Sequence, residues 1–210
     1  MASVFQFFSR FYGIVDSSSP LPPVEMARLM LAAGVRTIQL RLKSLPARDV
    51  LDSARSIADL CRSAGAIFIV NDRLDIAMLA GADGTHLGQD DLPLNSARRL
   101  AGPAHRIGIS THNLEQAREA EAQGADYIGF GPIFIGGTKN IQVGKGVAAI
   151  REIRAAVAIP IVAIGGITEA TAPEVIEAGA DAAAIISDVV TAPDISAKCR
   201  SILRTLDCKP

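Results

Sequence analysis

Short apolar runs alternate with amphipathic stretches along most of the chain. The runs show little apolar–polar alternation of their own, which is typical of parallel strands buried on both faces. They predict strands at residues 11–16, 37–43, 66–71, 84–89, 106–111, 126–131, 160–166 and 182–187.

The stretches between these runs have helical periodicity, which is clearest at residues 46–64, 113–123, 147–157 and 194–206. Several end in a glycine, which adopts the left-handed backbone of a helix end without a Cβ clash, at Gly34, Gly65, Gly81, Gly124 and Gly179. A helix after every strand predicts an α/β fold, a single (β/α)8 TIM barrel formed by residues 1–210, with residues 1–10 as an N-terminal extension. A doubly wound open sheet is the alternative, which eight strict alternations in so short a chain disfavour.

Composition and charge exclude several classes of protein. The chain has 21 Lys and Arg residues against 22 Asp and Glu residues, whereas a nucleic-acid-binding domain normally carries a basic excess. No apolar run approaches the roughly 20 residues that cross a bilayer. The N-terminus lacks the basic region of a secretory signal, and Cys61, Cys199 and Cys208 have neither disulfide-like nor metal-like spacing. We therefore expect a cytoplasmic protein that binds neither nucleic acid nor membrane.

Polar side chains gather where the predicted strands end. Active sites of such barrels lie at the carboxyl ends of the strands, and the sequence places there Gln39, Arg41, Lys43, Asn71, Asp72, Gln89, Asp91, Ser110 and His112. Because this recurs on one strand after another, we expect a shared active site. We expect a supporting role for His112, since Asn113 beside it resembles a helix N-cap, and we expect His86, within a strand, to be packed or hydrogen-bonded.

Two cations and two carboxylates carry the clearest chemistry. Arg41 and Lys43 are two residues apart, so they share one face of a strand and suit an anionic ligand such as phosphate. Asp72 and Asp91 end neighbouring strands, and their oxygens suit Mg²⁺ bridging to a diphosphate. Ion pairs among these groups, or helix capping by the carboxylates, are the alternatives that the residues leave open.

A second anion site is predicted after the last two strands. Gly165 and Gly166 follow the seventh strand, and Ile186 and Ser187 follow the eighth, where barrels commonly bind a monophosphate through backbone N–H groups. Lys139 lies in a glycine-containing loop that would close over an anion, although a solvated lysine is the simpler interpretation.

These segments together resemble the thiamine phosphate synthase family. The resemblance covers about residues 11–205 and is carried by QLRLK (39–43), FIVNDRLDIAMLAGADGTHLGQDD (68–91), IGISTHNLEQAREAEAQGADYIGFGPIF (107–134), PIVAIGGI (160–167) and IIS (185–187). It implies a (β/α)8 barrel that joins hydroxymethylpyrimidine diphosphate to hydroxyethylthiazole phosphate, with Mg²⁺ as cofactor and release of diphosphate.

The resemblance also implies roles for individual residues. The pyrimidine diphosphate would be held by Gln39, Arg41, Lys43, Asn71, Ser110 and Lys139. The groups acting in catalysis would be Arg41, Lys43, Ser110 and Lys139. The Mg²⁺ ligands would be Asp72 and Asp91. The thiazole phosphate would be held by Thr138, Gly166, Ile186 and Ser187, with Gly136 at the same site.

Two positions depart from the family pattern. Gly136 stands where the family usually has threonine, so one hydroxyl donor to the thiazole phosphate is missing. Asp188 follows Ser187 where the family usually has a small apolar residue, and its carboxylate would repel a phosphate unless it points away. The altered loop makes a non-catalytic paralogue that binds pyrimidine or thiamine phosphates one alternative. A thiazole tautomerase-like isomerase is another, which the complete set of diphosphate residues disfavours. The sequence leaves open whether the chain forms homo-oligomers.

Overall fold

The computed structural model describes residues 9–135 and 144–207, so most of the predicted N-terminal extension lies outside the described residues. Eight parallel strands close into a barrel in the order of the chain. The strands are β1 (Phe11–Asp16), β2 (Thr37–Arg41), β3 (Ile67–Asn71), β4 (Gly84–Leu87), β5 (Arg106–Thr111), β6 (Tyr127–Phe130), β7 (Ile161–Ile164) and β8 (Ala182–Ile185). Because β8 pairs with β1, Phe11 opposite Ala183, the sheet has no edge, and the TIM barrel rather than the open sheet is confirmed.

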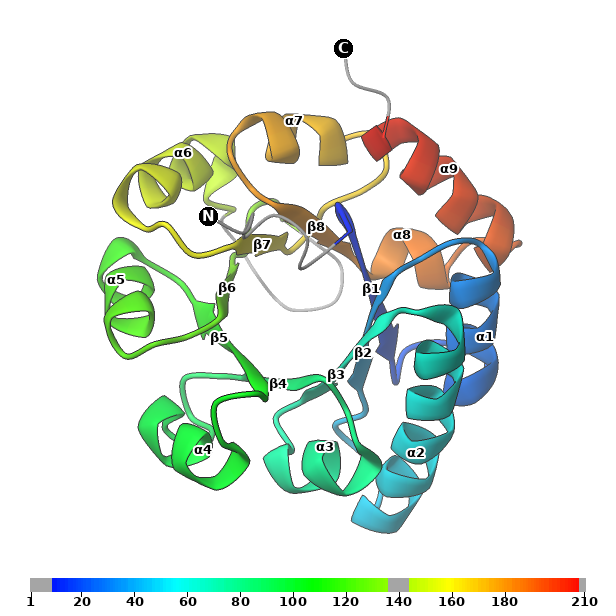
Figure 1. The fold of residues 1–210 in the computed structure, drawn as a ribbon. Helices are drawn as coiled ribbons and strands as arrows, with labels where there is room; N and C mark the ends of the chain where they lie inside the picture. The colour runs from blue at the N-terminus through cyan, green and yellow to red at the C-terminus, as the bar shows by residue number, and fades with distance from the viewer. Residues whose placement is uncertain (1–8, 136–143, 208–210) are drawn as a thin grey trace.

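Helices form a ring around the strands (Figure 1). They are α1 (Pro23–Ala32), α2 (Ala47–Ala64), α3 (Leu74–Ala80), α4 (Leu94–Ala101), α5 (Leu114–Ala122), α6 (Gly146–Ala156), α7 (Ala172–Glu177), α8 (Ser187–Val190) and α9 (Ile195–Asp207). Among the described residues, no helix combines the length and the apolar character that crossing a membrane requires.

Several strands end earlier than the sequence predicts. β2 ends at Arg41, so Lys43 lies beyond the strand and the prediction that both share one strand face is wrong for Lys43. β7 ends at Ile164, because Gly165 and Gly166 adopt positive φ angles of 101° and 63° and turn the chain out of the sheet. The active-site loops therefore begin one or two residues earlier than expected.

The core has two parts. The larger one packs the outer faces of the strands against the helices, as in Phe68 and Ile57. The smaller one fills the barrel interior and includes Tyr12 and Tyr127, which face small side chains such as Ala182. Glycines make room for these rings, since a Cβ at Gly108 would lie 2.1 Å from Cζ of Tyr127. Because side chains fill the barrel interior, we expect the active site at the strand ends.

The end of the barrel where the strands begin is held by a repeated motif. The sequence Gly-Ala-Asp occurs three times after a helix, at residues 81–83, 124–126 and 179–181. Each aspartate accepts a backbone N–H near the start of a strand: Asp83 from Phe68, Asp126 from Ile107 and Asp181 from Ile161. Each also pairs with an arginine: Asp83 with Arg106, Asp126 with Arg98 and Asp181 with Arg154. These bonds tie helix ends to strand starts.

Candidate active site

The carboxyl ends of the strands bring most of the sequence-predicted site residues to one end of the barrel. Gln39 and Arg41 are on β2, Asn71 ends β3, and Ser110 is on β5. Gly166 follows β7, and Ile186 follows β8. Gly136, Thr138 and Lys139 lie outside the described residues, so the structure leaves their predicted roles untested.

Arg41 is already paired with an aspartate that the sequence analysis did not single out. Nη1 of Arg41 lies 2.5 Å from Oδ2 of Asp16, the last residue of β1. Burial alone would raise the pKa of Asp16, but hydrogen bonds from Ser18 and Arg41 outweigh it and hold the pKa below its ordinary value. The ion-pair alternative for Arg41 is thus what the structure shows, and the pair fixes the guanidinium at the rim of the barrel.

Lys43, Asp72 and Asp91 form a second cluster. Nζ of Lys43 is 3.2 Å from Oδ2 of Asp72. Asp72 has a positive φ of 61°, and its N–H donates to the His86 carbonyl, so the backbone holds it in a conformation that side chains rarely adopt. Asp91 accepts the N–H of Gly88 at 2.6 Å and lies near the Asp72 carboxyl group.

This cluster carries an excess of negative charge. Burial raises the pKa of Asp91, and the neighbouring Asp72 adds to the effect, whereas the N–H of Gly88 and the charge of Lys43 oppose it. Two neighbouring carboxylates near one ammonium group leave a net negative charge, which a bound cation would neutralise. No group of three or more His, Cys, Asp and Glu side chains suited to a metal occurs within residues 9–135 and 144–207. The two carboxylates fit Mg²⁺, which commonly takes one or two protein carboxylates and completes its shell with phosphate oxygens and water.

A chain of hydrogen bonds crosses the barrel interior between two predicted site residues. Nε2 of Gln39 donates to the Tyr12 hydroxyl at 3.1 Å, and that hydroxyl lies 3.0 Å from the Tyr127 hydroxyl. His86 continues the chain, with Nδ1 3.1 Å from the Tyr127 hydroxyl and Nε2 2.9 Å from Oγ of Ser110. The chain therefore links β2 to β5 through side chains from β1, β6 and β4.

His86 is neutral in this setting. Burial lowers its pKa to about 4, although the charge of Asp91 opposes the shift. A neutral imidazole donates from one ring nitrogen and accepts at the other, so the ring orients the Ser110 hydroxyl. The prediction that His86 is hydrogen-bonded is confirmed. His112 Nδ1 lies 2.9 Å from the Gly131 carbonyl, a contact that suits the supporting role predicted for it.

Sequence reasoning did not identify Asp16, Tyr12 or Tyr127. Tyr12 and Tyr127 are 115 residues apart and meet only in the closed barrel. Two features of the sequence indicate this interior. Tyr12 is two residues before Ile14 and so shares its inward face of β1, and Gly108 leaves space for the Tyr127 ring. That signal becomes informative only once the strand order is known.

The predicted monophosphate region lies after β7 and β8. Gly166 has a φ of 63°, and a Cβ there would lie 2.8 Å from the carbonyl oxygen of Phe134, so glycine is required. Ser187 begins α8. The Asp188 carboxylate accepts the N–H of Glu169 at 2.8 Å and lies 3.0 Å from Nζ of Lys198. Asp188 is thus bound to groups on α9 and the β7–α7 segment. Lys198 neutralises this carboxylate, which the sequence predicts to repel a phosphate unless it points away.

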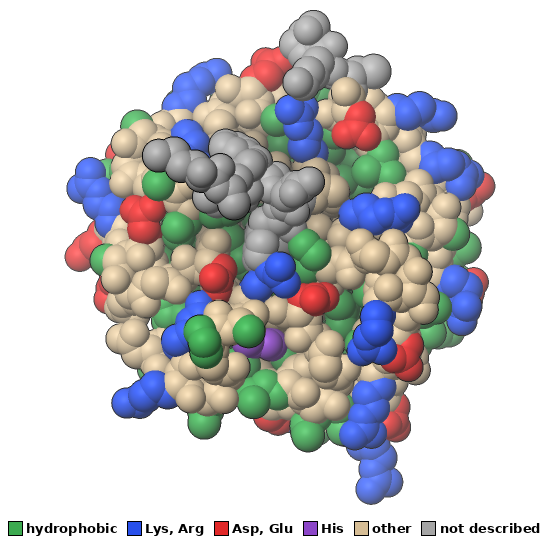
Figure 2. Space-filling model, viewed as in Figure 1, with side chains coloured by type: hydrophobic (Ala, Val, Ile, Leu, Met, Phe, Trp, Pro, Cys, Tyr) green, Lys and Arg blue, Asp and Glu red, His purple; other side chains and the backbone are tan. Residues whose placement is uncertain are grey.

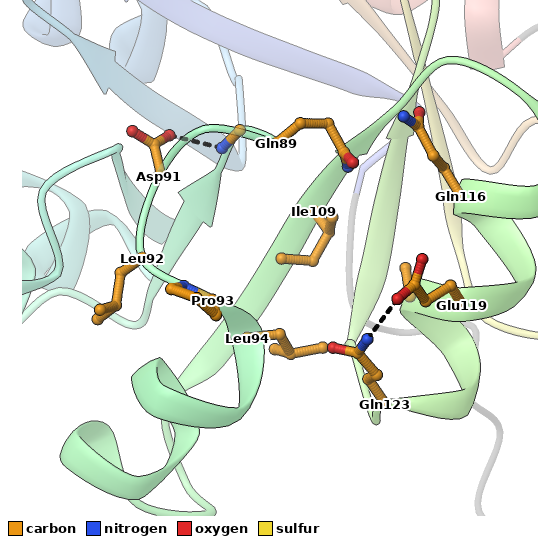
Figure 3. Close-up of a pocket in the computed structure, with 11 residues that line it drawn as sticks. Gln89, Asp91, Leu92, Pro93, Leu94, Ile109, Gln116, Glu119 and Gln123 are labelled. Carbon is orange, nitrogen blue, oxygen red and sulfur yellow. Dashed lines mark hydrogen bonds between the residues drawn. The ribbon is translucent and has the colours of Figure 1, made fainter.

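An open cleft lies beside the site, between α4 and α5 (Figure 3). Gln116 and Glu119 come from α5, Gln123 directly follows α5, and Leu92 and Pro93 come from the segment before α4. The cleft encloses about 570 Å³ including its open side, and of the predicted strand-end residues Gln89 and Asp91 line it. The Arg41 and Lys43 side chains do not line it, so we place the candidate active site at the strand ends rather than in this cleft.

Known proteins resemble this chain over most of its length. The family model described as thiamine monophosphate synthase matches residues 11–189. A thiamine-phosphate synthase from Methanoculleus marisnigri is 51% identical over 179 residues, 85% of each chain. One from Moorella thermoacetica is 50% identical over 183 residues, 86% of this chain and 87% of the relative. The solved thiamine phosphate pyrophosphorylase from Pyrococcus furiosus superposes with a TM-score of 0.87 at 36% identity, covering 94% of this chain and 96% of that one.

Proposed function

The chain belongs to the thiamine monophosphate synthase family, and from that premise we propose that it is a transferase that couples hydroxymethylpyrimidine diphosphate to hydroxyethylthiazole phosphate. The products are thiamine phosphate and diphosphate. The observation that carries the proposal is the cluster of Lys43, Asp72 and Asp91, with Arg41 close by in the sequence, at the end of the barrel where such enzymes act.

In this proposal the chain's cations hold the diphosphate leaving group. Arg41 and Lys43 have carboxylate partners that keep their charged groups in place before a ligand arrives. Gln39, Asn71 and Lys139 are proposed to complete the diphosphate site. Asp72 and Asp91 would hold Mg²⁺, which when bound supplies further neutralisation of the diphosphate charge. Holding charges ready for a leaving group is a large source of catalysis, since no reorganisation is needed during the reaction.

The reaction exchanges one bond for another at the pyrimidine methylene carbon. The bond to the diphosphate oxygen breaks and its electron pair leaves with the diphosphate, and the thiazole nitrogen then donates its electron pair to the same carbon. This chemistry needs no nucleophile from the protein, but it needs two aligned rings. Ser110, oriented by neutral His86, is proposed to hydrogen-bond the pyrimidine. Thr138, Gly166, Ile186 and Ser187, with Gly136 beside them, are proposed to place the thiazole phosphate.

The test is diphosphate release by the purified protein, with and without Mg²⁺, together with detection of thiamine phosphate. We expect release that needs both substrates and Mg²⁺, with equal amounts of the two products. Release of diphosphate without thiamine phosphate would contradict the proposal. Binding of either substrate without any product would instead favour the non-catalytic paralogue.

We also propose that the enzyme works in the cytoplasm on small phosphorylated substrates. Within the described residues Cys61 and Cys199 are free and buried. Burial raises the pKa of each thiol to about 12, so both are poorly reactive. Free thiols suit a reducing compartment. On the face shown in Figure 2, acidic and basic side chains are interspersed rather than sorted by sign, so that face offers no extended basic surface for nucleic acid.

A further inference from the structure

Three segments meet at the Asp188 carboxylate. Asp188 lies in α8, accepts the backbone N–H of Glu169 at 2.8 Å and is 3.0 Å from Nζ of Lys198 on α9. The Glu169 side chain returns to α9, where it accepts from Lys198 at 2.9 Å and from Ser201 at 2.5 Å. We call Glu169, Asp188, Lys198 and Ser201 the Asp188 network.

The segments that this network joins are two of those that form the predicted thiazole phosphate site. Glu169 follows Gly166 by three residues in the segment between β7 and α7, and Asp188 directly follows Ser187. A single carboxylate therefore connects the two backbone stretches. Neither Gly166 nor Ser187 has a side chain long enough to make that connection.

The network also controls charge near that site. It contains two carboxylates and one ammonium group, and Ser201 donates a further hydrogen bond to Glu169. The hydrogen bonds from Ser201 and Lys198 lower the pKa of Glu169. Side-chain exposure is 22% for Lys198 and 24% for each acid, so solvent screens these charges only partly. Lys198 is positioned to prevent the two acids from repelling a phosphate.

We propose that Asp188 is a positioning residue for the thiazole phosphate: it holds the β7–α7 segment against α8, and Lys198 neutralises it so that the site keeps its affinity for an anion. The inference rests on the proposed function and deepens it. Asp188 touches neither the reacting atoms nor the phosphate in this assignment. It acts through the backbone of its neighbours.

The first test separates positioning from general stability. Asp188→Ala should raise the KM for hydroxyethylthiazole phosphate about tenfold or more, since the phosphate-binding backbone loses its fixed spacing. The KM for the pyrimidine diphosphate and the kcat at saturation should stay within about twofold. Isothermal titration with hydroxyethylthiazole phosphate alone should show the same loss as a rise in Kd. Asp188→Asn, which keeps an acceptor for the Glu169 N–H, should lose less.

The second test isolates the charge. Lys198→Met leaves Asp188 and Glu169 without their ammonium partner, so the Kd for hydroxyethylthiazole phosphate should rise and the rise should shrink at high salt. The double variant Asp188→Asn, Lys198→Met should recover most of that loss. Asp126→Ala is the matched control: it breaks an aspartate–arginine pair at the opposite end of the barrel and should lower the melting temperature without changing this Kd.

The outcomes distinguish this inference from the proposed function. Product formation by the wild type together with an unchanged Kd in Asp188→Ala would overturn the inference alone. Equal rises in both KM values, in step with a lower melting temperature, would overturn it too, because they indicate a merely structural residue. If the wild type binds hydroxyethylthiazole phosphate but forms no thiamine phosphate, and Asp188→Ala weakens that binding, the inference would be supported and the proposed synthase activity rejected. A wild type that does not bind hydroxyethylthiazole phosphate would reject both.

Discussion

Three aspartates at one end of the barrel and two at the other have opposite kinds of partners. Where the strands begin, each of Asp83, Asp126 and Asp181 has an arginine and a backbone N–H as partners. Where the strands end, Asp72 and Asp91 lie near each other, and Lys43 pairs with Asp72. Carboxylates with complete sets of partners stabilise a fold, whereas crowded carboxylates are stabilised by the ligand or cation that joins them. Stability and function are therefore expected to respond separately to mutation.

The largest effect is expected at the crowded end. Asp72→Asn removes one of the two facing carboxylates and keeps a residue type that tolerates a positive φ. Diphosphate release should fall about 1,000-fold. The melting temperature should stay the same or rise, because a like-charge contact is removed. Steady-state assays beside thermal melts check both results, and Lys43→Ala should lose activity similarly. A wild-type rate in either variant would show that this cluster takes no part in the reaction.

The next effect should appear only in stability. Asp126→Ala removes the carboxylate that accepts from both Arg98 and the Ile107 N–H at the opposite end. Because both side chains are about one-third exposed, we expect a loss of about 1–3 kcal/mol in the free energy of unfolding, with kcat unchanged. Urea unfolding measures the loss. Asp83→Ala should cost less, since its arginine partner is 3.8 Å away. A fall in the kcat of Asp126→Ala without a change in its free energy of unfolding would mean that the two ends of the barrel do not contribute separately to stability and activity.

A smaller effect is expected from restoring a hydroxyl group. Gly136→Thr introduces the donor that the family usually has at this position, which lies outside the described residues. One hydrogen bond to a charged group would lower the KM for hydroxyethylthiazole phosphate about tenfold. Gly136→Ala is the control without a hydroxyl, and it should not lower this KM. An unchanged KM in the threonine variant would show that the thiazole phosphate does not need this donor.

The smallest effect concerns acid stability at the rim. The pKa of Asp16 is lower in the folded protein than its ordinary value, so the ionised carboxylate stabilises the fold above the unfolded pKa of about 3.9. That contribution is lost as the pH falls through the folded pKa. The difference in unfolding free energy between wild type and Asp16→Asn should therefore be constant above about pH 5 and shrink below about pH 4. A difference that grows in acid would contradict this interpretation.

The sequence predicted the barrel because its signal is local and repeated: each apolar run, helix and glycine cap can be recognised within a few residues. The partners of the site residues are not local. Asp16 lies 25 residues from Arg41, and Tyr127 lies 41 residues from His86, so both contacts depend on which strands become neighbours. Asp188 was recognised as unusual, but its partner Lys198 lies on a later helix that the periodicity alone does not orient. The alternation of Arg41 and Lys43 predicts that both lie on one strand, but β2 ends at Arg41, and the alternation does not mark that end.

The glycine at position 108 has a consequence for how such barrels change over evolutionary time. The space where a Cβ would stand is filled by the Tyr127 ring, which is hydrogen-bonded to His86. A larger residue at 108 is acceptable only after the residue at 127 becomes smaller, and that second change removes the hydroxyl partner of His86. The residues at positions 108 and 127 should therefore change together among descendants of this sequence. Replacement of the polar interior by a hydrophobic one should pass through a protein in which Ser110 is no longer oriented.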